Sequence, residues 1–169
     1  MISPNYLKEG ATVAIVSTAR KISKKELIPA ITILKKWGLK VVLGKSIEAE
    51  EHQFAGNDKL RTSDFQAMLD HPGIDAVWCA RGGYGTVRII DQLDFSNFKK
   101  HPKWIIGYSD VTVLHSHIHQ LGIETLHAQM PVSIETKPEV TINSIKAILF
   151  GEHYGIRIPA ENNNINGKT

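Results

Sequence analysis

The stretch IIGYSDVTVLHSHIHQ, from Ile105 to Gln120, contains two kinds of sequence pattern in direct succession. It begins with apolar, strand-forming residues, turns at Gly107, and continues with apolar residues at helical spacing from about Asp110 to Leu121. A strand that leads directly into a helix is the repeating unit of α/β proteins. Ser109 lies at this junction, where its side chain could either cap the helix or take part in catalysis.

The same alternation runs through the rest of the chain. Apolar runs predict strands at 12–17, 39–44, 74–80, 103–108 and 123–128, and helical periodicity predicts helices at 23–37, 57–70, 87–93, 110–121 and 139–150. Strands separated by helices favour a largely parallel sheet. The polar, Asn-rich end of the chain has no periodicity, so we expect a domain over residues 1–158 and the start of a linker at 159–169.

Composition narrows the classes of function. The chain has 169 residues, of which 42% are hydrophobic and 22% charged, as in a globular protein. The net charge of +3 is spread along the chain without a basic stripe, so we expect no nucleic-acid partner. Neither a signal-peptide pattern nor a long apolar run is present, and Cys79 is a lone cysteine, which leads us to expect a cytoplasmic protein without a membrane partner.

Three loops that follow predicted strands are candidates for a binding site. They lie after Ser17, in RGGYGT after the third strand, and in GYSD after the fourth strand. Ligands of open parallel sheets bind at the carboxyl ends of the strands, so these loops should converge.

A serine on a strand-to-helix turn fits a nucleophile elbow, although Val111 stands where many hydrolases have a second glycine. The alternative is that Ser109 or Asp110 only caps the helix. The glycines of RGGYGT fit a tight turn equally well, but beside a serine their amides could hold an oxyanion. Gly82 or Gly83 would then supply one backbone donor and Asp110 the other.

The histidines offer no clear base for Ser109. His115 is too far along the predicted helix to reach the hydroxyl, at about 1.5 Å of rise per residue. His115 and His119 have the i,i+4 spacing of metal ligands, but no third ligand accompanies them, and we expect no metal and no cofactor. His127 ends the fifth predicted strand and remains open as a base, although nothing in the sequence orients it.

Four segments together resemble the LD-carboxypeptidases, also called murein tetrapeptide carboxypeptidases, a family of serine peptidases. They are LKEGATVAIVS, NDKLRTSDFQAMLDHPGIDAVWCARGGYGTVRIIDQLDF, KWIIGYSDVTVLH and GIETLHAQM, in the order and spacing of the family. The resemblance implies a flavodoxin-like, three-layer domain, with helices on both faces of the sheet. It departs from the family at HAQM, where members often have His-Gly-Pro-Met.

The resemblance also implies a Ser–Glu–His triad in which Ser109 is the nucleophile. The glutamate and histidine would lie in a C-terminal domain beyond the end of this chain, so we expect this chain alone to be inactive. The implied reaction removes the terminal D-alanine from murein tetrapeptide in cell-wall recycling, and we expect the full-length enzyme to be a homodimer. Arg81, Tyr84 and Tyr108 are the expected substrate contacts.

Other interpretations stay open at this stage. Arg88 could hold a substrate carboxylate together with Arg81, or form a structural ion pair. A branch of the same family cleaves peptidyl-nucleotide antibiotics and confers self-immunity. Outside the family, the chain could be a non-catalytic flavodoxin-like module whose RGGYGT loop binds a phosphate, or an interaction domain with a vestigial elbow.

Overall fold

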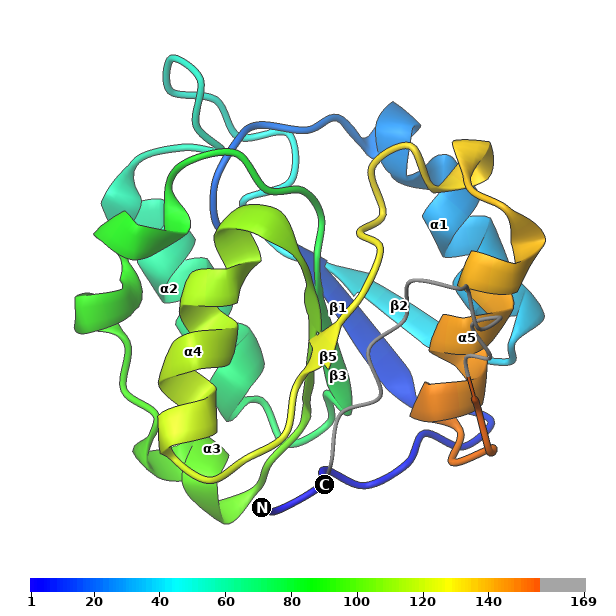
Figure 1. Ribbon diagram of the computed structural model, residues 1–169. Coiled ribbons are helices and arrows are strands. Elements are labelled where there is room, and N and C mark those ends of the chain that lie inside the picture. Colours follow the sequence, from blue (N-terminus) through cyan, green and yellow to red (C-terminus); the bar gives the residue numbers. More distant parts are fainter. Residues whose placement is uncertain (156–169) are drawn as a thin grey trace, which may run out of the picture.

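The computed structural model describes residues 1–155, and in them five parallel strands form one sheet in the order β2-β1-β3-β4-β5 (Figure 1). The strands are β1 (Thr12–Val16), β2 (Lys40–Leu43), β3 (Ala76–Cys79), β4 (Trp104–Gly107) and β5 (Leu126–His127). This is the strand order of flavodoxin-like proteins, in which the order reverses between β1 and β3. The expected α/β class and parallel sheet are therefore confirmed.

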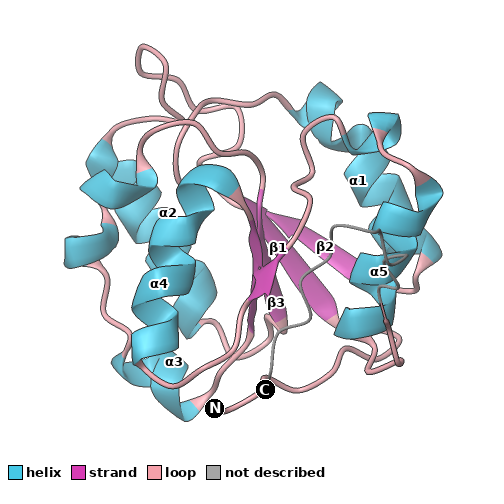
Figure 2. Cartoon of the chain, in the orientation of Figure 1, coloured by secondary structure: helices cyan, strands magenta, loops and turns pink. Residues whose placement is uncertain are grey.

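Helices cover both faces of the sheet, which gives three layers (Figure 2). They are α1 (Lys24–Lys36), α2 (Asp58–Asp70), α3 (Ser96–Lys100), α4 (Thr112–Gln120) and α5 (Glu139–Leu149). α1 and α5 lie on one face, and α2, α3 and α4 on the other.

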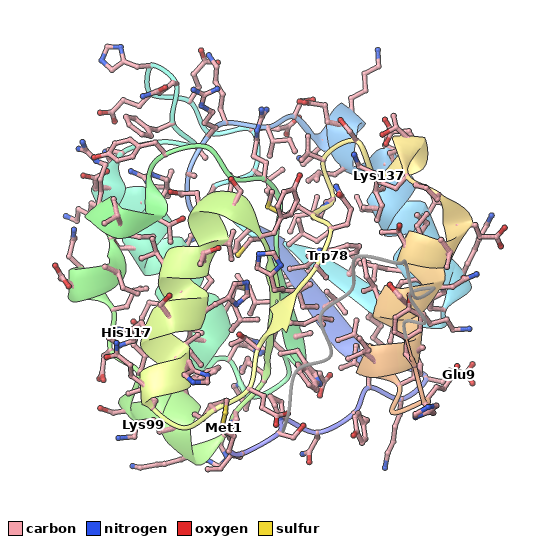
Figure 3. All side chains as sticks on the ribbon, in the orientation of Figure 1. Met1, Glu9, Trp78, Lys99, His117 and Lys137 are labelled. Carbon is pink, nitrogen blue, oxygen red and sulfur yellow. The ribbon has the colours of Figure 1, made fainter. Side chains whose placement is uncertain are left out.

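Successive residues of the strands pack alternately in two separate hydrophobic cores, one on each face of the sheet. Val13 and Ile15 of β1 pack in the core beneath α1 and α5, whereas Ala14 and Val16 pack in the core beneath α2, α3 and α4. Both faces of the strand are therefore buried, which explains why its sequence is continuously apolar and does not alternate with polar residues. Trp78 of β3, labelled near the middle of Figure 3, belongs to the first core and donates its indole N–H to the carbonyl of Gln129 at 2.9 Å.

The ends of the two longest helices follow from local chemistry. Ser23 and Glu26 form a capping box at the start of α1, and Asn57 accepts from the amide of Leu60 at the start of α2. Gly38, at φ 78°, lies directly after Trp37, the C-cap residue of α1.

Three predicted elements differ from the observed ones. The helix expected at 87–93 is two 3₁₀ turns, Thr86–Arg88 and Ile90–Gln92, and the helix expected from Asp110 begins as a 3₁₀ turn, Ser109–Val111. β5 has only two residues, Leu126 and His127, and the bond from the amide of Ala128 to the carbonyl of Gly107 directly follows its pairing with β4. The short helix α3 was not predicted, since one turn around a single buried residue, Phe98, has no readable period.

The proposed linker at 159–169 lies outside the described residues, and the boundary at residue 158 remains a prediction. Within residues 1–155, no helix has both the length and the apolar character required to cross a bilayer.

Candidate active site

The three candidate loops meet at the carboxyl ends of β1, β3 and β4, which are neighbours in the sheet. The adjacency follows from the strand order, since the loops leave the same edge of adjacent parallel strands. Their convergence brings together Ser109, the glycines of residues 82–85, and Thr18.

Ser109 occupies a strained turn between β4 and α4. Its φ is 61°, in the left-handed region that costs non-glycine residues energy, and its side chain is exposed. Gly107 precedes it at φ 159°, and a Cβ there would lie 2.9 Å from Cγ1 of Val111. Strained serines of this kind are a property of nucleophile elbows, where the turn pushes the hydroxyl away from the sheet.

The helix-cap interpretation of Ser109 and Asp110 is wrong. The residue that precedes α4 is Val111, and among residues 1–155 no side chain caps α4 or the 3₁₀ turn before it. Asp110 instead turns its carboxylate towards the glycine loop, where Oδ2 accepts a hydrogen bond of 2.9 Å from the amide of Thr86.

The glycine loop passes close over Ser109. A Cβ added to Gly82 would lie 3.3 Å from both Cβ and Oγ of Ser109, and 3.4 Å from the amide nitrogen of Asp110. Among residues 1–155, the amides of Gly82 and Gly83 have no hydrogen-bond acceptor. Because Gly82 has no side chain, the loop backbone lies close to the serine hydroxyl and to the amide of Asp110.

A second connection fixes the loop after β1 to the same place. The hydroxyls of Thr18 and Thr86 are 2.8 Å apart and form a buried hydrogen bond. Thr86 thus contacts the first loop through its side chain and Asp110 through its amide.

His115 is a structural residue with both ring nitrogens engaged. Nε2 donates to the carbonyl of Gly107 at 2.9 Å, so in the neutral ring Nδ1 accepts from the hydroxyl of Thr125 at 2.8 Å. Burial lowers the pKa of His115, although the bond to Gly107 opposes the shift, and the nearby His127 lowers it further. With both nitrogens occupied, His115 is unsuited to bind metal or to act as the base.

The other histidines also leave Ser109 without a partner in this part of the protein. His127 is exposed beside Gly107 on β5, with its ring 5.7 Å from that of His115. His117 extends from α4 away from the sheet and packs on Phe95 (Figure 3). Ser109 Oγ forms no hydrogen bond with any residue from 1 to 155, and that region holds no cluster of three possible metal-ligating side chains.

The two arginines that flank the glycine loop have different surroundings. Arg81 donates to the carbonyl of Lys21 at 3.2 Å and lies 3.9 Å from Glu26, at the wall of an open pocket. Arg88 binds the carboxylate of Asp58 through two nitrogens, at 2.7 and 3.0 Å, so its ion-pair interpretation is confirmed. The hydrogen bond from Arg88 is the largest cause of the lowered pKa of Asp58.

The two tyrosines named from the sequence pack near different aromatic side chains. Tyr84 is 49% exposed, and its ring centroid is 6.3 Å from that of Phe54. Tyr108 is half-buried, with its ring 6.2 Å from that of His127. Both side chains reach the surface.

Arg61 was missed by the sequence reasoning. It lies on α2, is fully buried, and contacts two of the converging loops through its guanidinium. The sequence did contain one indication of its position. Arg61 lies four residues before Phe65 on the same predicted helix, and this spacing places Arg61 on the helix face that packs on the core.

Known proteins resemble this chain in sequence and structure. Residues 13–128 match the family model described as the LD-carboxypeptidase N-terminal domain. A probable murein peptide carboxypeptidase of Bacillus subtilis (strain 168) is 41% identical over 128 residues, which are 75% of this chain and 40% of that protein. The microcin C7 self-immunity protein MccF of Escherichia coli is 28% identical over 158 residues, which are 89% of this chain and 46% of that protein.

Solved structures agree with the fold. MccF in complex with aspartyl sulfamoyl adenosine superposes with a TM-score of 0.83 at 25% identity, covering 92% of this chain and 50% of that chain. A muramoyltetrapeptide carboxypeptidase from Oxalobacter formigenes gives a TM-score of 0.72 at 26% identity, covering 82% and 47%. This chain therefore spans about half the length of the relatives that it matches, and it belongs to the LD-carboxypeptidase family, whose N-terminal domain it contains.

Proposed function

We propose that this chain supplies the nucleophile of a serine LD-carboxypeptidase that removes the terminal D-alanine from murein tetrapeptide. The observation that carries the proposal is the exposed hydroxyl of Ser109, on a strained turn, with the backbone of Gly82 close beside it. Membership of the family and the murein peptide carboxypeptidase of Bacillus subtilis support the substrate class.

In this proposal, Ser109 Oγ attacks the carbonyl carbon of the scissile peptide bond and transfers its proton to a histidine base. The amides of Asp110 and of Gly82 or Gly83 hold the oxyanion of the tetrahedral intermediate. The bond to the leaving D-alanine then breaks, its nitrogen takes the proton, and water releases the acyl group from Ser109.

We propose that the base and its glutamate come from protein beyond this chain. Two observations support this: the described residues give Ser109 Oγ no hydrogen-bond partner, and the relatives are about twice as long as this chain. This chain alone should therefore release D-alanine far more slowly than the intact enzyme, with only the rate that binding and the oxyanion donors provide.

Substrate contacts in the proposal come from the rim of the same loop. Arg81 borders an open pocket. Among residues 1–155 its guanidinium has only a single backbone acceptor and one carboxylate at 3.9 Å, so it can still bind a peptide carboxylate. Tyr84 and Tyr108 can pack against the peptide from either side.

The test uses the intact protein, with its second domain, and murein tetrapeptide. Ser109→Ala is expected to lower D-alanine release by about 10⁴-fold or more, as in other enzymes that lose their nucleophile. Ser116→Ala, on the exposed surface of α4, is the matched control and should leave the rate unchanged. A fluorophosphonate probe should label Ser109 in the parent protein, and full activity of Ser109→Ala would exclude the proposed mechanism.

A second candidate is an immunity peptidase like MccF. The observation that favours it is the agreement with MccF over 92% of this chain, at a TM-score of 0.83. The intact protein should be offered both murein tetrapeptide and aspartyl sulfamoyl adenosine. Faster cleavage of the nucleotide compound would favour the immunity function, and faster release of D-alanine the murein function.

A further inference from the structure

Arg61 is a buried charge that joins three separate loops. Its side chain has 0% exposure, and its donors reach backbone carbonyls of three segments that are distant in sequence. Nη1 donates to Thr18 at 2.5 Å and to Gly85 at 2.9 Å, and Nε donates to Gly56 at 3.3 Å. Nη2 pairs with the carboxylate of Asp58.

The glycine loop packs directly on this guanidinium. Gly85 has a φ of 156°, and a Cβ at that position would lie 2.8 Å from both Nη1 of Arg61 and Cα of Ala19. Only a residue without a side chain allows the loop to come this close. The carbonyl of Gly85 is thereby fixed in place one residue before Thr86.

A short chain of contacts leads from Arg61 to the serine turn. Arg61 holds the carbonyl of Gly85, and the next residue, Thr86, donates its amide to Asp110. Asp110 follows Ser109 directly, and Gly82 of the same loop faces Ser109. The distance between the loop amides and the serine hydroxyl therefore depends on where Arg61 holds the loop.

Stability alone gives a weak reason for a charge at this position. Desolvation by burial lowers the pKa of Arg61, while Asp58 opposes that shift. Buried ion pairs are often no more stabilising than apolar residues of similar volume, because desolvation offsets their attraction. The planar guanidinium of arginine, however, has several N–H donors in a fixed arrangement. It can therefore hold several carbonyls in one geometry, which an apolar side chain cannot do.

We propose that Arg61 is a positioning residue, which acts through the glycine loop to hold the amides of Gly82 and Gly83 at the distance from Ser109 that oxyanion binding requires. This inference rests on the proposed function. Arg61 itself bonds to Thr18, Gly56, Gly85 and Asp58, and not to Ser109.

The test compares variants of Arg61 with variants of Arg88 in the intact protein. Arg61→Lys keeps the charge but loses the fork, and Arg61→Met keeps the length of the side chain while Asp58 retains Arg88 as its partner. We expect kcat for D-alanine release to fall about 10-fold for lysine and about 100-fold for methionine, with KM changed less than about threefold. Arg88→Lys and Arg88→Met are the matched controls, because Arg88 shares both Asp58 and the ring of Phe54 with Arg61. Among residues 1–155, Arg88 interacts with the glycine loop through the side chain of Tyr84 and not through a loop carbonyl.

A second measurement separates this inference from the proposed function. Amide hydrogen exchange of Thr86, whose N–H is hydrogen-bonded to Asp110, can be followed in the protein whether or not it cleaves a peptide. We expect the Arg61 variants to exchange at least about tenfold faster there, with α5 unchanged, and the Arg88 variants to match the parent. Unchanged exchange and kcat in folded Arg61 variants would overturn the inference. Failure of both Arg61 variants to fold would also overturn it, because Arg61 would then serve stability. Full activity of Ser109→Ala would overturn the proposed function and the oxyanion role of the loop, whereas the exchange of Thr86 would still report whether Arg61 holds the loop.

Discussion

The carboxylate of Asp110 accepts a hydrogen bond of 2.9 Å from the backbone N–H of Thr86, which joins the turn of Ser109 to the glycine loop. The two segments follow neighbouring strands, β4 and β3. Asp110 therefore has two separate roles: its side chain fixes the loop, and its amide lies beside Ser109, where the proposed oxyanion would form.

Removing this acceptor should weaken both the fold and the site. Asp110→Ala leaves the Thr86 amide without its charged partner, and we expect the free energy of unfolding to fall by about 1.5 kcal/mol. Asp110→Asn keeps an acceptor oxygen and should lose less than half of that amount. Urea unfolding of both variants, monitored by tryptophan fluorescence, measures these two losses of unfolding free energy. Equal losses for Asp110→Ala and Asp110→Asn would show that the hydrogen bond to Thr86 contributes nothing specific.

Gly82 should tolerate a methyl group in the fold but not in the reaction. A Cβ at Gly82 would sit 3.3 Å from Ser109 Oγ, in the space where the substrate carbonyl is expected. Gly82→Ala in the intact protein should therefore lower D-alanine release and fluorophosphonate labelling at least roughly tenfold. Gly73→Ala is the matched control, because its nearest neighbour is the ring of His71 on the surface, and it should react like the parent. Normal labelling of Gly82→Ala would mean that the serine is approached from another side.

The strain at Ser109 should be measurable in the stability of the protein. Glycine adopts the left-handed conformation without penalty, whereas serine and alanine pay about 1 kcal/mol or more. At φ 61°, Ser109→Gly should therefore be more stable than Ser109→Ala by about 1 kcal/mol, although both lack the hydroxyl. Equal midpoints in chemical unfolding would indicate that the turn relaxes when the hydroxyl is removed.

His115 should make the stability of this domain depend on pH. Burial lowers its pKa from the ordinary value of 6.5, so the unfolded chain takes up a proton more readily than the folded one. The stabilisation from neutral His115 is complete above the unfolded pKa and is lost as the pH falls through the folded pKa. Between about pH 7.5 and about pH 5.5, the parent should lose more free energy of unfolding than His115→Gln, which cannot titrate. His119→Gln, on the exposed side of the same helix, should follow the parent, and parallel pH profiles for parent and His115→Gln would contradict the assignment.

Much of this fold could be predicted from local patterns. The strands and the helices with clear caps, such as those that begin after Ser23 and Asn57, follow from periodicity and capping chemistry over a few residues. The errors fall where a few residues are shaped by distant contacts, as in the 3₁₀ turns after the glycine loop. The candidate site could be anticipated in outline, because parallel strands bring their carboxyl ends to one edge.

The sequence by itself determined the α/β layers, the glycine loop, and a serine after a strand, since these depend on residue types and short spacings. Only the tertiary structure decided that Asp110 bonds to Thr86 and that both ring nitrogens of His115 bond to Gly107 and Thr125. It also decided that Arg61 lies against the glycine loop. These contacts join residues from different elements of the chain. They exist only when the strands are placed in their order and the side chains compete for the same buried donors and acceptors, which no local pattern encodes.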